Sequence, residues 1–266
     1  MTDLLWKPDE DTYANSAIKN FADTIAKNYG IQIDEYQDLW QWSINEKEKF
    51  WSTLLQFLGI RYSGNIDPVI TNDELIYDQK FFPNISLNYA ENIIFNLNNT
   101  PIIFINEKGF RQEITKEEKI EKVSSLSSYL RSIGIKKGDR VAAISANTPN
   151  TLISFLSVNS IGAVWSSCSP DFGEAAILDR FNQIEPKVLL YSEIYFYGGK
   201  KFNIKERVSN IIREIKTLEK SLCINYQDSK EEHIKNDVID VNSIFNDSKF
   251  CGDINFEQCS FNDPMY

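Results

Sequence analysis

The sequence predicts an α/β protein, with an N-terminal helical extension followed by a parallel sheet that helices cover on both faces. Apolar residues recur every three or four positions through roughly the first sixty residues, which is the spacing of amphipathic helices. After residue 101, short apolar runs alternate with helical patterns, and the connections between them are short. Strands joined through helices in this way pair in parallel, so the alternation predicts a covered parallel sheet.

The first predicted helix covers residues 14–29. Asn15 or Ser16 can cap its start, because short polar side chains accept hydrogen bonds from the free amides there, and Gly30 can end it. One apolar face is expected, made of Ile18, Phe21, Ala22 and Ile25.

Residues 34–58 predict two further helices, which Asp34 and Ser43 cap and Gly59 closes. The second of them has the clearer apolar spacing, carried by Phe50, Trp51, Leu54, Leu55 and Leu58. The anchors of the first are Leu39, Trp40 and Trp42.

A short helix is expected over residues 87–94, with Asn88 or Ser86 as its cap. Residues 101–115 then read as two strands around the turn Lys108-Gly109. A glycine between two alternating apolar runs is typical of a hairpin.

The remaining elements alternate strictly up to about residue 226. Helices are predicted over residues 116–134, 147–162, 171–186 and 205–220. Strands are predicted over residues 139–146, 163–169, 187–193 and 221–226. Thr148 or Asn147 can cap the second helix, with Pro149 at its tolerated first position. Residues 226–256 are polar and irregular, and we expect a surface excursion that returns to the sheet.

Composition narrows the classes of function. The net charge of −10 gives no general attraction to nucleic acid or to an anionic membrane. No basic segment followed by an apolar run opens the chain, and no apolar stretch approaches the ~20 residues that span a bilayer. Scattered thiols without a C-x-x-C pair, and a single histidine, indicate a cytoplasmic protein without a metal site. These residues are Cys168, Cys223, Cys251, Cys259 and His233.

Ligands of open parallel sheets bind where the strands end, and three predicted loops lie there. The first is Ala146-Asn147-Thr148, which either binds an anion at a helix start or only caps that helix. The second is Cys168-Ser169-Pro170-Asp171. Here Asp171 suits helix capping, and Cys168 is either a nucleophile for which only His233 could serve as base or part of a tight packed turn.

The third loop, from Ser192 to Lys201 with the residues after it, is the most suggestive. Gly198 and Gly199 permit close backbone approach, and a run of cations follows them. Those cations are Lys200, Lys201, Lys205 and Arg207. Such a turn suits a phosphate, and a solvated basic loop is the alternative. Neither of the two common glycine-rich nucleotide motifs occurs in the chain, and adjacent acids such as Glu117/Glu118 and Glu231/Glu232 read as solvated faces.

Several stretches together resemble the acetoacetyl-CoA synthetase family of acyl-adenylate-forming enzymes, which is related to acetyl-CoA synthetase. They include "YQDLWQWSINEKEKFWSTLLQFLGI", "LNYAEN", "GAVWSSCSPDFG", "DRFNQIEPKVL" and "YFYGGKKFN". The resemblance implies an AMP-forming acid–CoA ligase: ATP and acetoacetate give an acyl-adenylate and pyrophosphate, and the CoA thiol then displaces AMP. ATP, CoA and magnesium are the implied cofactors, and small molecules are the implied partners.

The resemblance also assigns site residues. Tyr197, Gly198, Gly199 and Lys200 match the position where related enzymes contact CoA, although an arginine commonly stands in place of Tyr197. The family's Ser/Thr/Gly-rich phosphate loop and its catalytic lysine have no counterpart here. We therefore expect the catalytic residues beyond Tyr266, and the ATP site to be absent from this chain. "SFNDPMY", residues 260–266, reads as a turn and the first step of a strand.

These implications define two regions. Residues 1–98 correspond to the N-terminal helical region of acetyl-CoA synthetases, and residues 99–266 to the first part of an AMP-binding (adenylation) domain, incomplete and truncated before the phosphate loop. The chain alone is then expected to be inactive, with a separately encoded C-terminal part as a partner. Two alternatives stay open: a non-enzymatic remnant or split subunit that binds CoA or a partner chain, and a ligase for acetate, propionate or another short acid.

Overall fold

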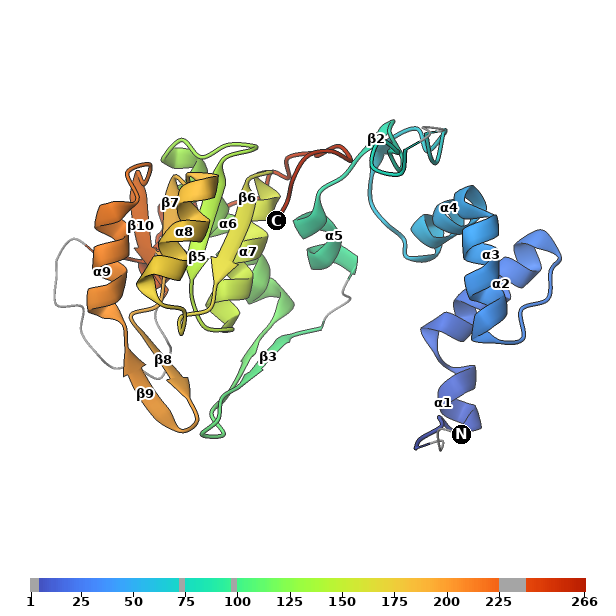
Figure 1. Cartoon of the computed structure of the whole chain (residues 1–266), viewed down its shortest axis with the longest axis horizontal. Helices are drawn as coiled ribbons and strands as arrows, with labels where there is room; N and C mark the ends of the chain where they lie inside the picture. Colours follow the sequence, from blue (N-terminus) through green and yellow to red (C-terminus); the bar gives the residue numbers. More distant parts are fainter. Residues whose placement is uncertain (1–4, 72–74, 97–99, 225–237) are drawn as a thin grey trace. The chain divides into compact units, whose positions relative to one another are not determined.

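The computed structural model describes residues 5–71, 75–96, 100–224 and 238–266 (Figure 1). It divides into two compact units, Met1–Ile85 and Ser86–Tyr266. Helix α5 (Tyr89–Asn96) packs on helix α7 (Pro149–Ser160), so it belongs to the second unit. The units thus divide before the boundary at 98/99 that the sequence suggests for the two regions.

Helices build the first unit. They are α1 (Glu10–Ala14), α2 (Ala17–Tyr29), α3 (Tyr36–Asn45) and α4 (Lys47–Phe57), followed by the short strand β1 (Ser63–Gly64); the short strand β2 (Ile85–Ser86) spans the division between the units. Phe21 and Ile25 of α2 are buried against Leu39 of α3, with the aromatic ring of Phe57 5.1 Å from that of Phe21. The predicted apolar face of α2 is wrong only at Ile18, which is 46% exposed.

The helix starts in this unit agree only partly with the predicted caps. Ser16 caps α2, accepting from the Lys19 amide at 3.2 Å, as one of the two predictions has it. Ser43 caps nothing, because its hydroxyl donates to the Trp40 carbonyl at 2.7 Å from inside α3. Helix α4 begins after Glu46 instead.

The Asp34 cap is also wrong by one residue. Helix α3 begins after Glu35, whose amide donates to the Asp38 carboxylate at 3.0 Å. The same carboxylate accepts from the Asp34 amide at 3.1 Å. The Asp38 carboxylate, on the third residue of the helix, thus serves the amides that precede the helix, as in a capping box around Glu35, and the helix starts one residue later than predicted.

A five-stranded sheet in the order β11-β10-β7-β5-β6 forms the centre of the second unit, and every pair of neighbours is parallel. Its strands are β5 (Arg140–Ile144), β6 (Val164–Cys168), β7 (Val188–Tyr191), β10 (Lys220–Cys223) and β11 (Ile239–Asp240). In the register, Val141 lies between Trp165 and Val188. The predicted fold class is confirmed.

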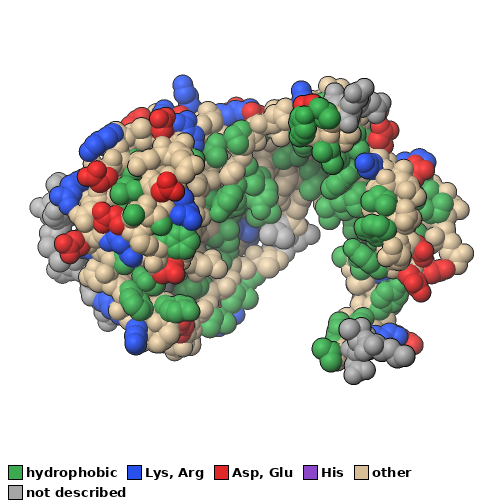
Figure 2. All heavy atoms as spheres, viewed as in Figure 1, with side chains coloured by type: hydrophobic (Ala, Val, Ile, Leu, Met, Phe, Trp, Pro, Cys, Tyr) green, Lys and Arg blue, Asp and Glu red, His purple; other side chains and the backbone are tan. Residues whose placement is uncertain are grey.

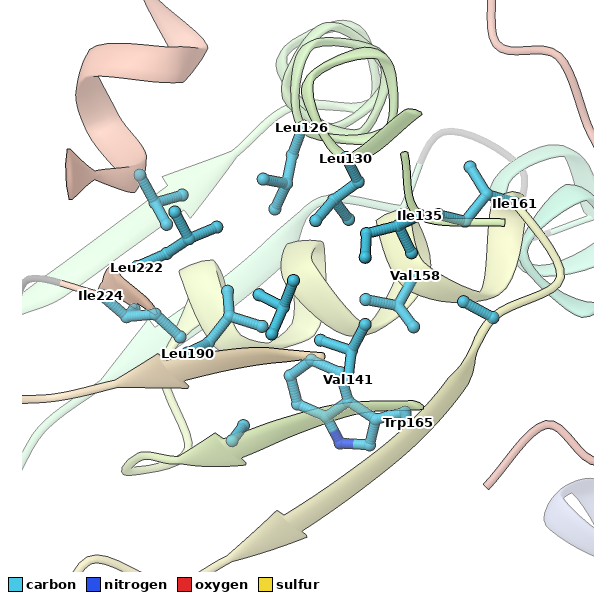
Figure 3. Packing of buried hydrophobic residues seen from close by; sticks show 14 of the residues in the cluster. Leu126, Leu130, Ile135, Val141, Val158, Ile161, Trp165, Leu190, Leu222 and Ile224 are labelled. Atoms are coloured by element: carbon cyan, nitrogen blue, oxygen red, sulfur yellow. The ribbon is translucent and has the colours of Figure 1, made fainter. Parts of the chain in front are cut away.

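Helices cover both faces of this sheet. They are α6 (Lys116–Ser132), α7, α8 (Glu174–Ile184), α9 (Lys205–Glu214) and α10 (Val241–Phe245), with a 3₁₀ turn at Ser248–Phe250. Figure 3 shows Leu126 and Leu130 of α6 above Val141, in the cluster that also contains Leu190 and Leu222. Strand alternation puts the neighbouring Ala142 on the other face, in the cluster that holds residues of α8 and α9.

Two antiparallel hairpins stand apart from the sheet. Strands β3 (Ile102–Ile105) and β4 (Arg111–Ile114) form the predicted one. Strands β8 (Ile194–Tyr197) and β9 (Lys200–Asn203) form a second, where a loop is predicted from the sequence. Gly198 and Gly199 are its turn, with φ angles of 58° and 73°. Two consecutive left-handed residues are what the tightest hairpin turn requires, and glycine adopts them without strain.

The predicted polar excursion returns to the sheet through β11 and α10, which share the segment "VIDVNSIF". Residues 225–237 lie outside the described part of the chain. The predictions for His233 and for the pair Glu231/Glu232 fall there.

The last residues lie beside strand β6. The predicted turn is present: the Ser260 amide donates to the Asp263 carboxylate at 2.7 Å, and Lys137 pairs with Asp263 at 2.8 Å. The Trp165 amide then donates to the Met265 carbonyl at 3.0 Å. Among the helices in the described ranges, none has the length and apolar character needed to cross a membrane.

Candidate functional site

The first predicted loop is a helix cap. The Thr148 hydroxyl accepts from the Thr151 amide at 3.4 Å and begins α7. The Thr151 hydroxyl donates in turn to the Ala146 carbonyl at 2.8 Å, and Ser145 lies 3.2 Å from the same hydroxyl. These polar groups satisfy one another, so the capping alternative describes this loop.

The second loop is a packed turn. Cys168 is buried with 5% exposure, and burial raises the pKa of its thiol, which disfavours the nucleophilic thiolate. The Phe172 amide donates to the Ser169 carbonyl at 3.2 Å and closes the turn. Helix α8 begins after Gly173, so Asp171 is not its cap residue, contrary to the prediction.

Arg207 contacts this turn. Its Nη2 donates to the Pro170 carbonyl, which ties the start of α9 to the loop before α8. Its Nε is buried without a hydrogen-bond partner among the described residues. Lys205 pairs with Glu193 at 3.2 Å, so its charge is also matched within the protein. Of the four cations predicted for the third loop, these two are engaged elsewhere.

Lys200 stands at the tip of the β8–β9 hairpin, next to Gly199. Its side chain is exposed, and among the described residues its ammonium forms no ion pair. Tyr197, on the other side of the turn, is 72% exposed. Figure 2 shows cationic and acidic side chains interspersed over the second unit on the face it presents. The hairpin thus offers one aromatic ring and one cation on a short, well-formed turn.

The amides of this turn already hold an anion. Glu107, in the turn between β3 and β4, accepts from the Gly198 amide at 3.0 Å through Oε1 and from the Gly199 amide at 2.7 Å through Oε2. Successive amides in left-handed conformation form a concave anion site. A carboxylate from another hairpin is thus bound at the glycines of the predicted site.

Sequence reasoning missed Glu107. The only signal was an acid directly before the predicted turn Lys108-Gly109. Which distant backbone this acid meets depends on how the two hairpins are placed by the sheet, and no local pattern carries that information. As for metals, no cluster of three or more potential ligands occurs within the described ranges.

Two family models match the chain. The model described as AMP-binding enzyme matches residues 98–251, and the one described as acetyl-coenzyme A synthetase N-terminus matches residues 36–93. The first match alone covers more than half of the 266 residues.

Known proteins resemble the chain along nearly its whole length. An acetoacetyl-CoA synthetase of Xenopus tropicalis is 34% identical over 99% of this chain and 40% of its own length. A malonamoyl-CoA synthetase of Penicillium aethiopicum is 31% identical over 82% of this chain and 31% of its own length. The chain thus spans less than half the length of these relatives.

The solved structure of an acetoacetyl-CoA synthetase from Streptomyces lividans matches with a TM-score of 0.89 and 29% identity, over 99% of this chain and 41% of that one. The resemblance found in the sequence motifs is confirmed. With both the sequence and the fold in agreement, the chain belongs to the AMP-binding enzyme family.

Proposed function

We propose that this protein is an AMP-forming acid–CoA ligase that joins acetoacetate to CoA at the expense of ATP. The observation that carries the proposal is the match of 99% of the chain to the S. lividans acetoacetyl-CoA synthetase structure. In this proposal, residues 1–98 are the N-terminal helical region, and residues 99–266 are the first part of the adenylation domain.

The β8–β9 turn, Tyr197 to Lys200, is the proposed CoA contact. CoA carries a 3′-phosphate and a diphosphate, which suit the Lys200 ammonium and the turn amides. The exposed Tyr197 ring can stack on the adenine base, an interaction that any aromatic side chain offers. The ladder from Ile194↔Asn203 to Tyr197↔Lys200 supports the proposal because it holds the turn in shape without a ligand.

The ATP and magnesium sites and the catalytic residues are proposed to lie outside these 266 residues. The chain contains no Ser/Thr/Gly-rich loop ending in lysine, and no group of metal ligands occurs in its described part. In the proposal, this chain supplies CoA contacts and one wall of the active site, and a further polypeptide segment supplies the adenylation chemistry.

Malonamate is an alternative acid, because one relative of the chain is named for malonamoyl-CoA. The Penicillium relative named for malonamoyl-CoA matches 82% of this chain, so the matched part is compatible with more than one acid. A non-enzymatic module that binds CoA or a partner chain is the other alternative. A ligase for another acid keeps the CoA contact and differs from the main proposal only in the acid, whereas a module that binds a partner chain needs no CoA contact.

The test measures pyrophosphate release and CoA binding separately. Acetoacetate-dependent pyrophosphate release is assayed with the chain alone and with the chain mixed with the remaining C-terminal part of the S. lividans relative. Release is expected only in the mixture, and more with acetoacetate than with acetate, propionate or malonamate. Release by the chain alone would contradict the placement of the ATP site, and a preference for another acid would replace acetoacetate.

CoA binding to the chain alone is measured by calorimetry. Replacing Lys200 with alanine should weaken it about two- to fivefold, because one exposed charge contact is lost. Lys220→Ala is the matched control. Lys220 is an exposed lysine at the first residue of β10, at the amino-terminal ends of the parallel strands, whereas the β8–β9 turn follows the carboxyl end of β7. Equal losses in both variants would show a general charge effect and would remove Lys200 from the site.

A further inference from the structure

The carboxylate of Glu107 joins the two hairpins of the second unit. Figure 1 shows the free ends of the hairpins β3–β4 and β8–β9 near each other. A pair of hydrogen bonds joins them, from Gly198 and Gly199 to Glu107, at 3.0 and 2.7 Å. Both amides of the proposed phosphate-binding turn are thus occupied by the chain's own anion.

The β3–β4 turn is built to present this carboxylate. The Asn106 side-chain oxygen accepts from the amides of Lys108 and Phe110, at 2.9 Å each. The Gly109 amide donates to the Asn106 carbonyl at 3.0 Å, and Gly109 has a φ angle of 78°. These hydrogen bonds hold the backbone of the turn on both sides of Glu107 without help from the other hairpin.

The β8–β9 hairpin is likewise held without Glu107. Tyr195 and Phe202 stack across it with ring centroids 5.0 Å apart and planes inclined by 12°. Tyr195 is 9% exposed, so this stack anchors the hairpin on the protein. The Lys108 ammonium adds a contact between the tips, 4.5 Å from the centre of the Phe196 ring. Release of Glu107 therefore leaves a formed turn with two free amides.

We propose that Glu107 is a built-in competitor for the anion site of this turn, and that a phosphate group of CoA binds there only by displacing it. This rests on the proposed function for the identity of the ligand. Two adjacent amides can hold one anion, and a carboxylate left beside a bound phosphate repels it at close range. Competition and repulsion act in the same direction, so both weaken CoA binding in the protein as it stands.

The decisive variant is Glu107→Gln, which keeps the shape and removes the charge. Its amide group can accept from one glycine but opposes a donor to the other, so the closed state loses stability. CoA should bind about five- to tenfold more tightly to this variant than to the unchanged chain, by calorimetry at low salt. Glu113→Gln is the matched control, because it removes an acid from the same hairpin, one that pairs with Arg111 at 2.9 Å and not with the glycine turn. It should change the affinity less than twofold.

Two further binding measurements, with dephospho-CoA and with inorganic phosphate, test the competition by Glu107 separately from the CoA assignment. Dephospho-CoA distinguishes the 3′-phosphate from the diphosphate: if the gain in Glu107→Gln disappears with it, the 3′-phosphate is the competing group. Inorganic phosphate tests the anion site without CoA. Phosphate binding that strengthens in the variant, with no binding of CoA to either protein, supports the competitor and contradicts the CoA assignment.

The opposite result is equally clear. If CoA binds the unchanged chain as tightly as Glu107→Gln or more tightly, Glu107 does not compete with CoA and instead keeps the turn in its binding conformation. That result would refute the competition but leave the CoA assignment in place. Amide NMR adds a readout that needs no ligand. The amide proton resonances of Gly198 and Gly199 should move to higher field in Glu107→Gln and stay in place in Glu113→Gln. Unmoved resonances in Glu107→Gln would refute the hydrogen bonds from these amides to Glu107.

Discussion

The side-chain amide of Asn88 donates to the Glu257 carbonyl at 2.8 Å, across 169 residues of chain. The same nitrogen lies 2.9 Å from the Asn159 carbonyl and 3.3 Å from that of Ser160, at the end of α7. Its oxygen accepts from the Glu91 amide at 3.1 Å and caps α5. One buried side chain thus joins α5, α7 and the C-terminal segment, which gives the motif "LNYAEN" a structural role.

Replacing Asn88 with alanine should lower the free energy of unfolding by about 2–4 kcal/mol, because a cap and several buried carbonyl contacts are lost together. Urea unfolding followed by circular dichroism measures this change. Asn88→Asp should recover the cap only. Asn147→Ala is the control, since Asn147 is exposed beside the cap of α7, and it should change stability by less than about 0.5 kcal/mol. Equal effects of Asn88→Ala and Asn147→Ala would contradict the joining role.

Gly162 lies where the C-terminal segment crosses the turn before β6. Its φ angle is 68°, and an added Cβ would lie 3.0 Å from Glu257 Cγ and 3.1 Å from Lys137 Cγ. Gly162→Ala should therefore cost about 1–3 kcal/mol of stability through strain and crowding.

Two glycines separate these causes. Gly134 has a φ angle of 89° with open space around it, so Gly134→Ala measures strain alone. Gly173 has a φ angle of −66° and open space, so Gly173→Ala should be nearly neutral. The expected order of destabilisation in thermal melts is Gly162, Gly134, then Gly173. A loss at Gly134 as large as that at Gly162 would show that crowding contributes nothing.

The ion pair of Asp263 and Lys137 makes stability depend on pH. The hydrogen bond from Lys137 and then that from the Ser260 amide hold the pKa of Asp263 below its ordinary value. A lowered carboxyl pKa adds stability above the unfolded pKa of about 3.9, and this is lost as pH falls through the folded pKa. Since both side chains are about one-third exposed, the effect should stay below about 1 kcal/mol.

Asp263→Asn tests this linkage. The variant should be slightly less stable than the unchanged chain at pH 7, and the difference should shrink as pH falls through the lowered folded pKa of Asp263, by urea unfolding at low salt. At high pH the stability changes in the other direction. The hydrogen bond with Asp263 raises the pKa of Lys137, so the stability that the charged lysine adds is lost as pH rises through its folded pKa. A difference that grows toward acid pH would contradict the assignment.

Periodic elements of the second unit are predicted well from sequence because their apolar faces are complete. Strands such as Val188–Tyr191 are buried at every residue, and helix α6 opens with the reciprocal cap of Thr115 and Glu118. A strand that is buried on both faces has a continuous apolar run, and such a run is typical of a parallel sheet covered by helices. Helix starts in the first unit are predicted less well, because Asp34, Glu35 and Asp38 all offer oxygens and only geometry selects among them.

The candidate site is predicted in part. Its residues, Tyr197 to Lys200, follow from the family motif, but the hairpin that carries them does not. Strand β9 is exposed throughout, so it lacks the buried apolar residues by which a strand is predicted from sequence, and it pairs with β8 across the two glycines. Arg207 and Glu107 act through distant backbone groups, at Pro170 and at the two glycines, which no local pattern reveals.

The four thiols should differ in reactivity in a way that tests the nucleophile alternative. Cys251 is exposed, whereas burial raises the pKa of Cys168, Cys223 and Cys259. A thiol must ionise to attack, so a disulfide reagent at pH 8 should modify Cys251 first and the two thiols of the sheet only on unfolding. Cys251→Ser should remove the fast phase, as followed by absorbance, and Cys168→Ser should leave it unchanged. Fast modification of Cys168 in the folded chain would restore it as a candidate nucleophile, because only an opened or activated turn could expose its thiolate.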